Sequence, residues 1–275
     1  MFRRPLALLI LPVVSAFSFG QMTSSQTQEI IRRSAQATQG DWEQAPGFDF
    51  CEVDKTKTGS RTSLVLMIEG SPYYRLVQVN DKDLAPVQET AEQKRLASTM
   101  EHRKHETSEQ RTTRIARYEQ ERHRDQEMLA QLTDAMNFTY AGNETINSHF
   151  SYVFNATPRP GYAPKSMETQ VLTGMQGKLW IDTSSFRWVR VRAEVVKSVS
   201  IAGFLARVQP GTRFELEESP VGPEVWLPHR FTMHSRTKII FLFDKSSETN
   251  ETYFNYEPRG TLSAASCRIQ DASAR

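Results

Sequence analysis

Alternation of apolar and charged side chains within residues 174–228 constrains the fold of this chain more than any other feature. One run of seven residues shows the pattern in full: Val189, Arg190, Val191, Arg192, Ala193, Glu194 and Val195. Since strand side chains point to opposite faces with a period of two, such a run has one dry and one wet face. Turn residues divide the block into four or five segments of this kind, which predicts consecutive antiparallel strands. The dry face of the resulting sheet must be covered.

The first twenty residues have the three parts of a secretory signal peptide. Arg3 and Arg4 give the positive start, an apolar run follows over residues 5–19, and small residues precede a cleavage site before Gln21. We therefore expect residues 1–20 to be removed and the mature chain to be a soluble periplasmic protein. No later apolar stretch reaches the ~20 residues that a membrane-spanning helix needs.

Net charge argues against one class of partner. The chain has 34 Lys and Arg residues and 32 Asp and Glu residues, and two of the basic residues lie in the predicted signal peptide. The mature chain is therefore formally neutral, whereas a nucleic-acid-binding protein needs a concentrated basic face. The sequence predicts no nucleic-acid partner.

Two cysteines leave two interpretations open. In an oxidising compartment Cys51 and Cys267 could form a disulfide that joins the two ends of the domain. The sequence does not show that their Cα atoms come close enough, and two unpaired thiols are the favoured interpretation.

A long charged segment interrupts the predicted strands. Residues 25–38 predict a short amphipathic helix, and three extended pieces follow at 48–53, 63–69 and 73–79. Residues 86–136 lack Gly and Pro after Pro86 and are rich in Glu, Gln, Lys and Arg. This composition predicts a helical insertion, formed by two helices or by one long helix packed only at its ends.

The second half of the chain returns to strands. Residues 137–155 predict a hairpin with its turn at Gly142 and Asn143, and the small polar residues 261–275 predict a flexible tail. We therefore expect one mainly β domain over residues 21–260, with the helical insertion at 86–136.

Motifs that would carry chemistry are absent. The chain has no G-x-S-x-G, no H-E-x-x-H and no Gly-rich phosphate loop. His102 and His105, with Glu101, Glu106 and His123, have a spacing that a metal site on a helix could use, but a hydrated charged helix explains them better. We predict a protein that is not an enzyme and that binds no metal or cofactor.

Aromatic side chains gather in the predicted strands. Leu179, Trp180 and Ile181, as well as residues 239–243, are apolar on both faces, so these strands need cover on both sides. A curved sheet around an apolar groove that helices close would provide such cover, and a groove of this kind suits an acyl chain. An ordinary β core accounts for more than half of the aromatics in either case. The candidate groove residues are Tyr152, Phe154, Trp180, Trp188, Phe204, Phe214, Trp226 and Phe231.

Two motifs carry a resemblance to a known family. Residues 177–182 read GKLWID and are followed by FRWVR at 186–190, and residues 225–228 read VWLP. With the signal peptide and the early helix, these motifs resemble the superfamily of the LolA and LolB lipoprotein-localisation proteins and the RseB envelope-stress sensor.

The resemblance implies a mainly β (α+β) fold: a curved antiparallel sheet that forms an open, incomplete β-barrel, with helices as a lid. It implies a carrier that binds lipid or the acyl chains of lipoproteins. The alternative is a sensor that contacts an envelope protein through the charged insertion at 86–136, which has no counterpart in the carriers. No cysteine lies near the cleavage site, which favours a soluble carrier over a membrane-anchored receptor.

Overall fold

The computed structural model describes residues 22–201, 206–239 and 244–269. The predicted signal peptide at 1–20 therefore lies outside the described residues, as do residues 270–275 of the predicted tail. Within the described part, thirteen strands form one sheet in which every pairing is antiparallel. The predicted mainly β fold with an open, curved sheet is confirmed.

The helices begin where local signals predict. Thr23 caps α1 (Ser24–Gln44) and Thr107 caps α3 (Ser108–Ala135), each with a Gln at the third helical position that completes a capping box. α2 (Pro86–Lys104) starts at a proline, which suits the first turn of a helix. The predicted helical insertion is thus two helices, α2 and α3. Short 3-10 segments are η1 (Ala45–Gly47), η2 (Glu168–Gly174) and η3 (Ala264–Cys267).

The strands before and just after the insertion are β1 (Phe48–Thr56), β2 (Gly59–Ile68), β3 (Ser71–Val79), β4 (Lys82–Asp83), β5 (Met136–Ile146) and β6 (His149–Pro158). The remaining strands are β7 (Met175–Asp182), β8 (Trp188–Val195), β9 (Val199–Ile201), β10 (Ala206–Val208), β11 (Arg213–Pro220), β12 (Trp226–Ile239) and β13 (Asp244–Pro258).

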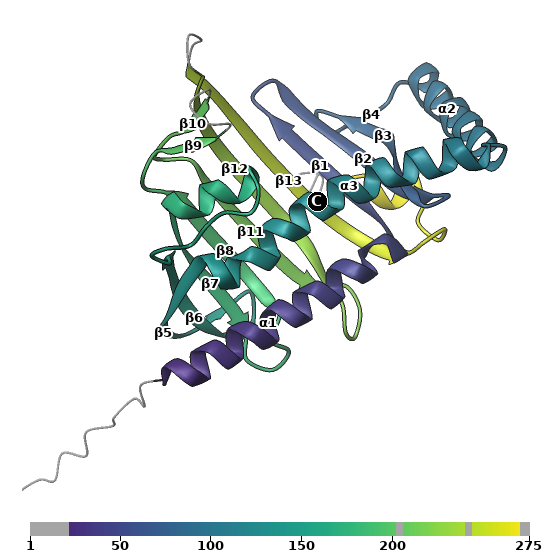
Figure 1. Cartoon of the computed structure of the whole chain (residues 1–275). Coiled ribbons are helices and arrows are strands. Elements are labelled where there is room, and N and C mark those ends of the chain that lie inside the picture. Colours follow the sequence, from purple (N-terminus) through teal and green to yellow (C-terminus); the bar gives the residue numbers. More distant parts are fainter. Residues whose placement is uncertain (1–21, 202–205, 240–243, 270–275) are drawn as a thin grey trace, which may run out of the picture.

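The sheet is open, with the order β4-β3-β2-β1-β13-β12-β11-β8-β7-β6-β5, and β10 pairs with β9 and β12 beside this path. Inside the sheet β1 pairs with β13, which brings the first and last strands of the chain together. In Figure 1 α1 and α3 cross in front of the sheet, while α2 lies beside β3 and β4.

The core lies on both faces of the sheet. On the face under the helices, Ile30 and Ile31 of α1 pack against Phe154, Leu179 and Trp188. On the opposite face Trp180 packs with a second apolar group: Ile146, Val153, Val189 and Trp226. β7 therefore buries Leu179, Trp180 and Ile181 together, as its lack of alternation predicts. The other predicted doubly apolar run lies largely outside the described residues, at 240–243.

The predicted turn of the β5–β6 hairpin is wrong. The chain turns at Asn147 and Ser148, both with positive φ (49° and 67°), while the pairing register shifts between Tyr140 and Gly142. Gly142, at φ 124°, thus belongs to a bulge inside β5. A Gly-Asn pair fits a bulge as well as a turn, because both need backbone conformations that glycine adopts freely.

The cysteines form a disulfide, which corrects the interpretation as two unpaired thiols. Cys51 of β1 and Cys267 of η3 are both fully buried, and their Cα atoms are 5.3 Å apart. Residues 261–269, expected to be part of a flexible tail, are thus fixed to the sheet. The amide of Ile269 also donates to the side-chain oxygen of Gln78 on β3.

Candidate functional site

The candidate site is a cavity of about 530 Å³ between the sheet and the helices that cover it. Apolar side chains from two α-helices, a 3-10 helix and the sheet form its wall. Ile31 comes from α1, Leu132 from the C-terminal half of α3, Leu172 from η2, and Leu179 and Val191 from the sheet. A cavity of this size and lining is typical of a site for a small apolar ligand.

The WID and RW motifs hold α1 over the cavity. Asp182 ends β7, and its Oδ1 accepts hydrogen bonds from the amides and hydroxyls of Ser184 and Ser185. This turn presents Arg187, whose Nε lies 2.8 Å from Oδ2 of Asp41 in the last turns of α1. The next residue, Trp188, lines the cavity. The motif therefore both anchors the helix and supplies part of the wall.

The eight predicted groove residues divide into four groups. Trp188, Phe214 and Phe231 line the cavity. Tyr152 and Phe154 belong to the apolar cluster under α1 but do not reach the cavity wall. Trp180 and Trp226 lie on the opposite face of the sheet and do not line the cavity. Phe204 lies outside the described residues.

Trp180 and Trp226 have other partners on that opposite face. The indole nitrogen of Trp180 donates to Oε2 of Glu144 at 2.8 Å, and the guanidinium groups of Arg190 and Arg192 lie about 6 Å from its ring. Trp226 packs against the ring of His149 at 4.5 Å between centroids. Both tryptophans therefore complete a second core layer on the face away from the helices.

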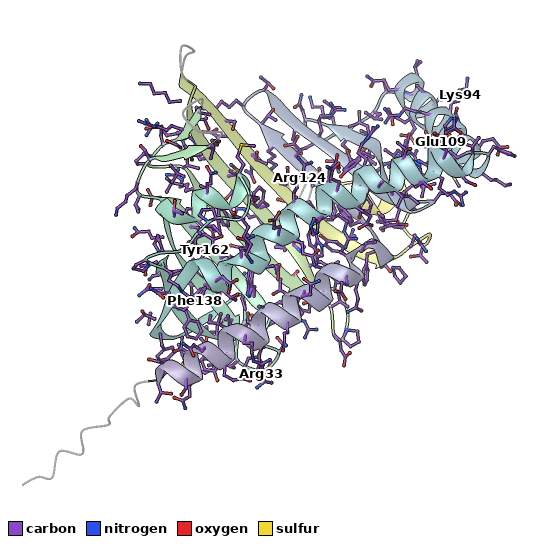
Figure 2. All side chains as sticks on the ribbon, in the orientation of Figure 1. Arg33, Lys94, Glu109, Arg124, Phe138 and Tyr162 are labelled. Atoms are coloured by element: carbon purple, nitrogen blue, oxygen red, sulfur yellow. A yellow bond between two sulfur atoms is a disulfide. The ribbon has the colours of Figure 1, made fainter. Side chains whose placement is uncertain are left out.

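Several wall residues were not predicted because they lie outside the strand block. Leu132 is in the charged insertion, Phe138 is in β5, and Val171 and Leu172 are in η2. Phe138 and Tyr162 belong to the cluster packed around the end of α3 (Figure 2). The sequence could have indicated Leu132, because the C-terminal end of the insertion has apolar side chains to bury whereas its middle has none.

One end of the cavity is polar. Glu251 and Tyr253 of β13 line it, and the hydroxyl of Tyr253 donates to Oε2 of Glu251. Nearby, burial raises the pKa of Glu52 on β1 to about 7, helped by the negative charges of Glu251 and Asp54. The cavity thus runs from an apolar region under α3 and η2 to carboxyl and phenol groups at β13.

A second group of buried carboxyls lies where α1 meets β11. Glu218 is 8% exposed, and its Oε2 has no hydrogen-bond partner among the described residues. Burial raises its pKa to about 8, the charge of Asp41 adds to the rise, and Arg187 opposes it. Burial also raises the pKa of Asp41, although Arg187 pulls it down. The Arg187 guanidinium therefore pairs with Asp41, and its charge also acts on Glu218.

A larger hollow, about 840 Å³, crosses the opposite face of the sheet. Its floor is main chain, and two rows of polar side chains flank it, as the register places Lys178, Arg192 and Glu215 side by side. Arg192 and Glu215 form an ion pair at 2.9 Å within one of these rows. Polar side chains flank this groove, whereas the cavity under the helices is lined mainly by apolar ones, so of these two hollows the cavity offers the better environment for an acyl chain.

The described helices and side chains show two further absences. No described helix is both long enough and apolar enough to cross a membrane. Within residues 22–201, 206–239 and 244–269, no three His, Cys, Asp or Glu side chains are grouped so as to hold a metal ion.

The chain thus forms an open antiparallel sheet, and the helices that cover this sheet enclose an apolar cavity against it. Solved structures similar to this chain include a putative outer-membrane lipoprotein-sorting protein domain from Vibrio parahaemolyticus, with 9% identity, a TM-score of 0.31, and 85% of this chain and 95% of that chain covered. A LolA superfamily protein from Nitrosomonas europaea has 13% identity and a TM-score of 0.29, with 89% and 97% covered. A DUF1329 family protein from Desulfovibrio piger has 10% identity and a TM-score of 0.28, with 86% and 95% covered.

Comparisons of sequence give no match. No family model matches the chain. No curated protein matches it either.

Proposed function

We propose that this protein is a periplasmic carrier or binding protein for lipid or for the acyl chains of lipoproteins, and that it does no catalysis. The observation that carries the proposal is the apolar cavity of about 530 Å³ between the helices and the sheet. The predicted signal peptide at residues 1–20 supports the location outside the cytoplasm.

Burial of an acyl chain would drive binding. Each methylene removed from water contributes about 0.8 kcal/mol, so a chain that buries about twelve of them gains ~10 kcal/mol before the cost of immobilisation. Part of this gain is lost when the ligand and the helices become ordered. The remainder suits reversible binding, which a carrier needs.

The test is to fill the cavity and measure binding of a fluorescent fatty acid to delipidated protein. Ala193 of β8 lines the cavity, so Ala193→Phe places a phenyl ring in the space that the ligand would occupy. We expect the affinity to fall about tenfold or more, because losing room for two methylenes corresponds to roughly 1.6 kcal/mol.

The matched control is Ala141→Phe, the same change at an exposed position of β5 outside the cavity. Equal affinity in the two variants would contradict the proposed site. Failure of the unmodified, delipidated protein to bind any fatty acid, phospholipid or acylated peptide would contradict the function itself.

A second candidate is contact with an envelope protein through the insertion. It is favoured by α2, which has no buried residue and presents exposed charges such as Lys94 (Figure 2). Replacing the exposed residues Lys94, Glu101 and Lys104 by Ala would abolish cross-linking to such a protein in cells. Fatty-acid binding would stay unchanged, because none of the three lines the cavity.

A further inference from the structure

β3 is an edge strand along most of its length. β2 pairs with one side of it, but β4 is only two residues long and pairs with Gln78 and Val79 alone. An exposed strand edge offers unpaired N–H and C=O groups to any other strand. Because alternate residues direct both groups to the same edge, those of Pro72, Tyr74 and Leu76 face away from β2.

Side chains of α2 occupy these edge positions in order. The amide of Leu76 donates to Oε2 of Glu92 at 3.2 Å. The carbonyl of Tyr74 accepts from Nη2 of Arg95 at 3.1 Å. The carbonyl of Pro72 accepts from Nη2 of Arg103, also at 3.1 Å. α2 thus takes the place that a neighbouring strand would have.

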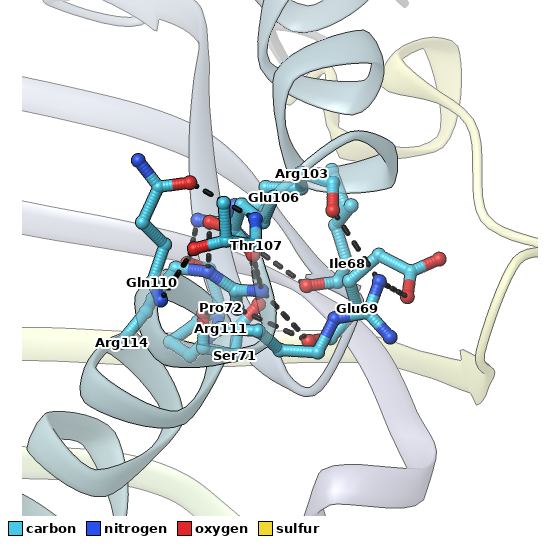
Figure 3. Close-up of polar contacts among 10 residues, drawn as sticks. All are labelled: Ile68, Glu69, Ser71, Pro72, Arg103, Glu106, Thr107, Gln110, Arg111 and Arg114. Carbon is cyan, nitrogen blue, oxygen red and sulfur yellow. Dashed lines mark hydrogen bonds and ion pairs between the residues drawn. The ribbon is translucent and has the colours of Figure 1, made fainter.

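The α2–α3 corner is tied to the β2–β3 turn by further arginine contacts, shown in Figure 3. Nη1 of Arg103 donates to the carbonyls of Ile68 and Ser71, both at 2.8 Å. Arg114 of α3 donates to the carbonyl of Glu69 and pairs with Glu106 between the helices. These contacts fix the C-terminal end of α2 over the start of β3.

The rest of α2 is held by Glu92, by Arg95 and by an ion pair between Glu89 and Arg75 of β3, whose side chains are mostly shielded from water. The helix itself has no buried residue, and the side chain of Arg95 is 54% exposed. Exposed ion pairs contribute little to stability, because water and salt screen them. A strand that offered main-chain hydrogen bonds to the same groups would compete with α2 for this edge.

The covered edge is complementary to itself. If two copies of residues 72–76 met antiparallel with Tyr74 opposite Tyr74, the amide and carbonyl of each Tyr74 would pair with the other. Each Leu76 amide would then donate to the opposite Pro72 carbonyl, while the missing N–H of proline leaves each Leu76 carbonyl without a partner, so the segment would form four main-chain bonds. Such a pairing has the two-fold symmetry of most homodimers.

We propose that the edge of β3 at residues 72–76 is a strand-addition surface for a second copy of this chain, and that α2 closes it. The charged insertion is then an edge guard: Glu92, Arg95 and Arg103 keep the sheet from extending into a neighbouring molecule.

The test removes the guard and measures association. The guard variant is Glu92→Ala, Arg95→Ala, Arg103→Ala, and the matched control is Lys94→Ala, Glu101→Ala, Lys104→Ala. The control also removes one acidic and two basic side chains from α2, but all three are exposed and none bonds to β3. Light scattering after gel filtration should give the guard variant about twice the mass of the wild type at high concentration, while the control keeps the wild-type mass.

Hydrogen exchange shows whether the guard has left the edge. At low concentration the Leu76 amide of the guard variant should exchange faster than in the wild type, and at high concentration it should again be protected. Fast exchange with no gain in mass at any concentration would overturn the proposal.

A cross-link tests the register. With the guard variant carrying Tyr74→Cys, oxidation should join two chains, because directly opposed hydrogen-bonded residues have Cα atoms about 5.5 Å apart, within disulfide range. The same cysteine with the guard intact should not react in this way, and equal cross-linking in both backgrounds would overturn closure by α2. If the triple change prevents folding, Arg95→Ala with Tyr74→Cys uncovers the Tyr74 carbonyl alone and should cross-link more slowly than the triple variant but faster than the intact guard.

Discussion

Glu218 makes the stability of this protein depend on pH in a direction opposite to that of most carboxyl groups. Its folded-state pKa is about 8, against 4.5 for an unperturbed glutamate, because burial and the charge of Asp41 disfavour the carboxylate. Between these two values the folded chain binds the proton more tightly than the unfolded chain does. The contribution of Glu218 to stability is therefore fully present below about pH 4.5 and is lost as the pH rises towards 8.

The size of the effect follows from the difference in pKa. Each pH unit within this window lowers the free energy of unfolding by up to about 1.4 kcal/mol, so the loss at neutral pH is several kcal/mol. Glu218→Gln keeps the size of the side chain but carries no titrating group. We expect this variant to be more stable than the wild type at pH 8.5 and to show a smaller fall in stability between pH 5.5 and 8.5.

Urea unfolding followed by tryptophan fluorescence at pH 5.5, 7.0 and 8.5 measures the effect. The control is Glu257→Gln, which removes an exposed carboxylate from β13 and should leave the wild-type pH dependence intact. Glu52, whose pKa is also raised, is present in both proteins, so its effect cancels in the comparison, whereas the effect of Asp41 is coupled to that of Glu218. Parallel pH profiles for the wild type and Glu218→Gln would refute the reasoning.

Two further predictions concern how the ends of the chain are held. Replacing Cys51 and Cys267 by Ser opens a loop with a sequence separation of 216 residues. Chain entropy predicts that the free energy of unfolding falls by about 5 kcal/mol, which urea unfolding measures. Equal stability of the variant and the oxidised wild type would contradict this prediction. Arg187→Ala leaves Asp41 buried without its cation, which typically costs 3–5 kcal/mol, and should speed hydrogen exchange in the last turns of α1. If exchange there stayed unchanged, Arg187 would not be the anchor of α1.

The sequence predicted the strands better than it predicted their faces. Charged residues mark the wet face of β8 and β11, so the dry positions Val191, Phe214 and Leu216 could be assigned from alternation. The expectation that Val189 shares this face is wrong, because the pairing of β7 with β8 shifts register there and Val189 packs with Trp180 on the opposite face. In β7 no charged residue separates Leu179, Trp180 and Ile181, and alternation then gives no hint as to which side faces the helices. The pairing register decides it, and the register depends on long-range contacts that the local sequence does not contain.

The sequence also could not predict which part of the fold the helical insertion contacts. Glu92, Arg95 and Arg103 look like ordinary residues of a hydrated helix, in a segment rich in Glu, Gln, Lys and Arg. Their role depends on the edge of β3, more than fifteen residues earlier in the chain. Composition predicted the helices correctly, but it could not show which backbone groups they cover.

The pairing of β1 with β13 inside the sheet has a consequence for folding. Hairpins among β1, β2 and β3 can form early, but β1 must wait for the last strand before its second edge is paired. The sheet therefore closes late and through contacts of very high sequence separation, which predicts slow folding. Until then β1 has an unpaired edge of its own, and a strand edge left open during folding is prone to aggregation. Until β13 has paired with β1, such a chain avoids aggregation if a chaperone binds it or if its concentration stays low.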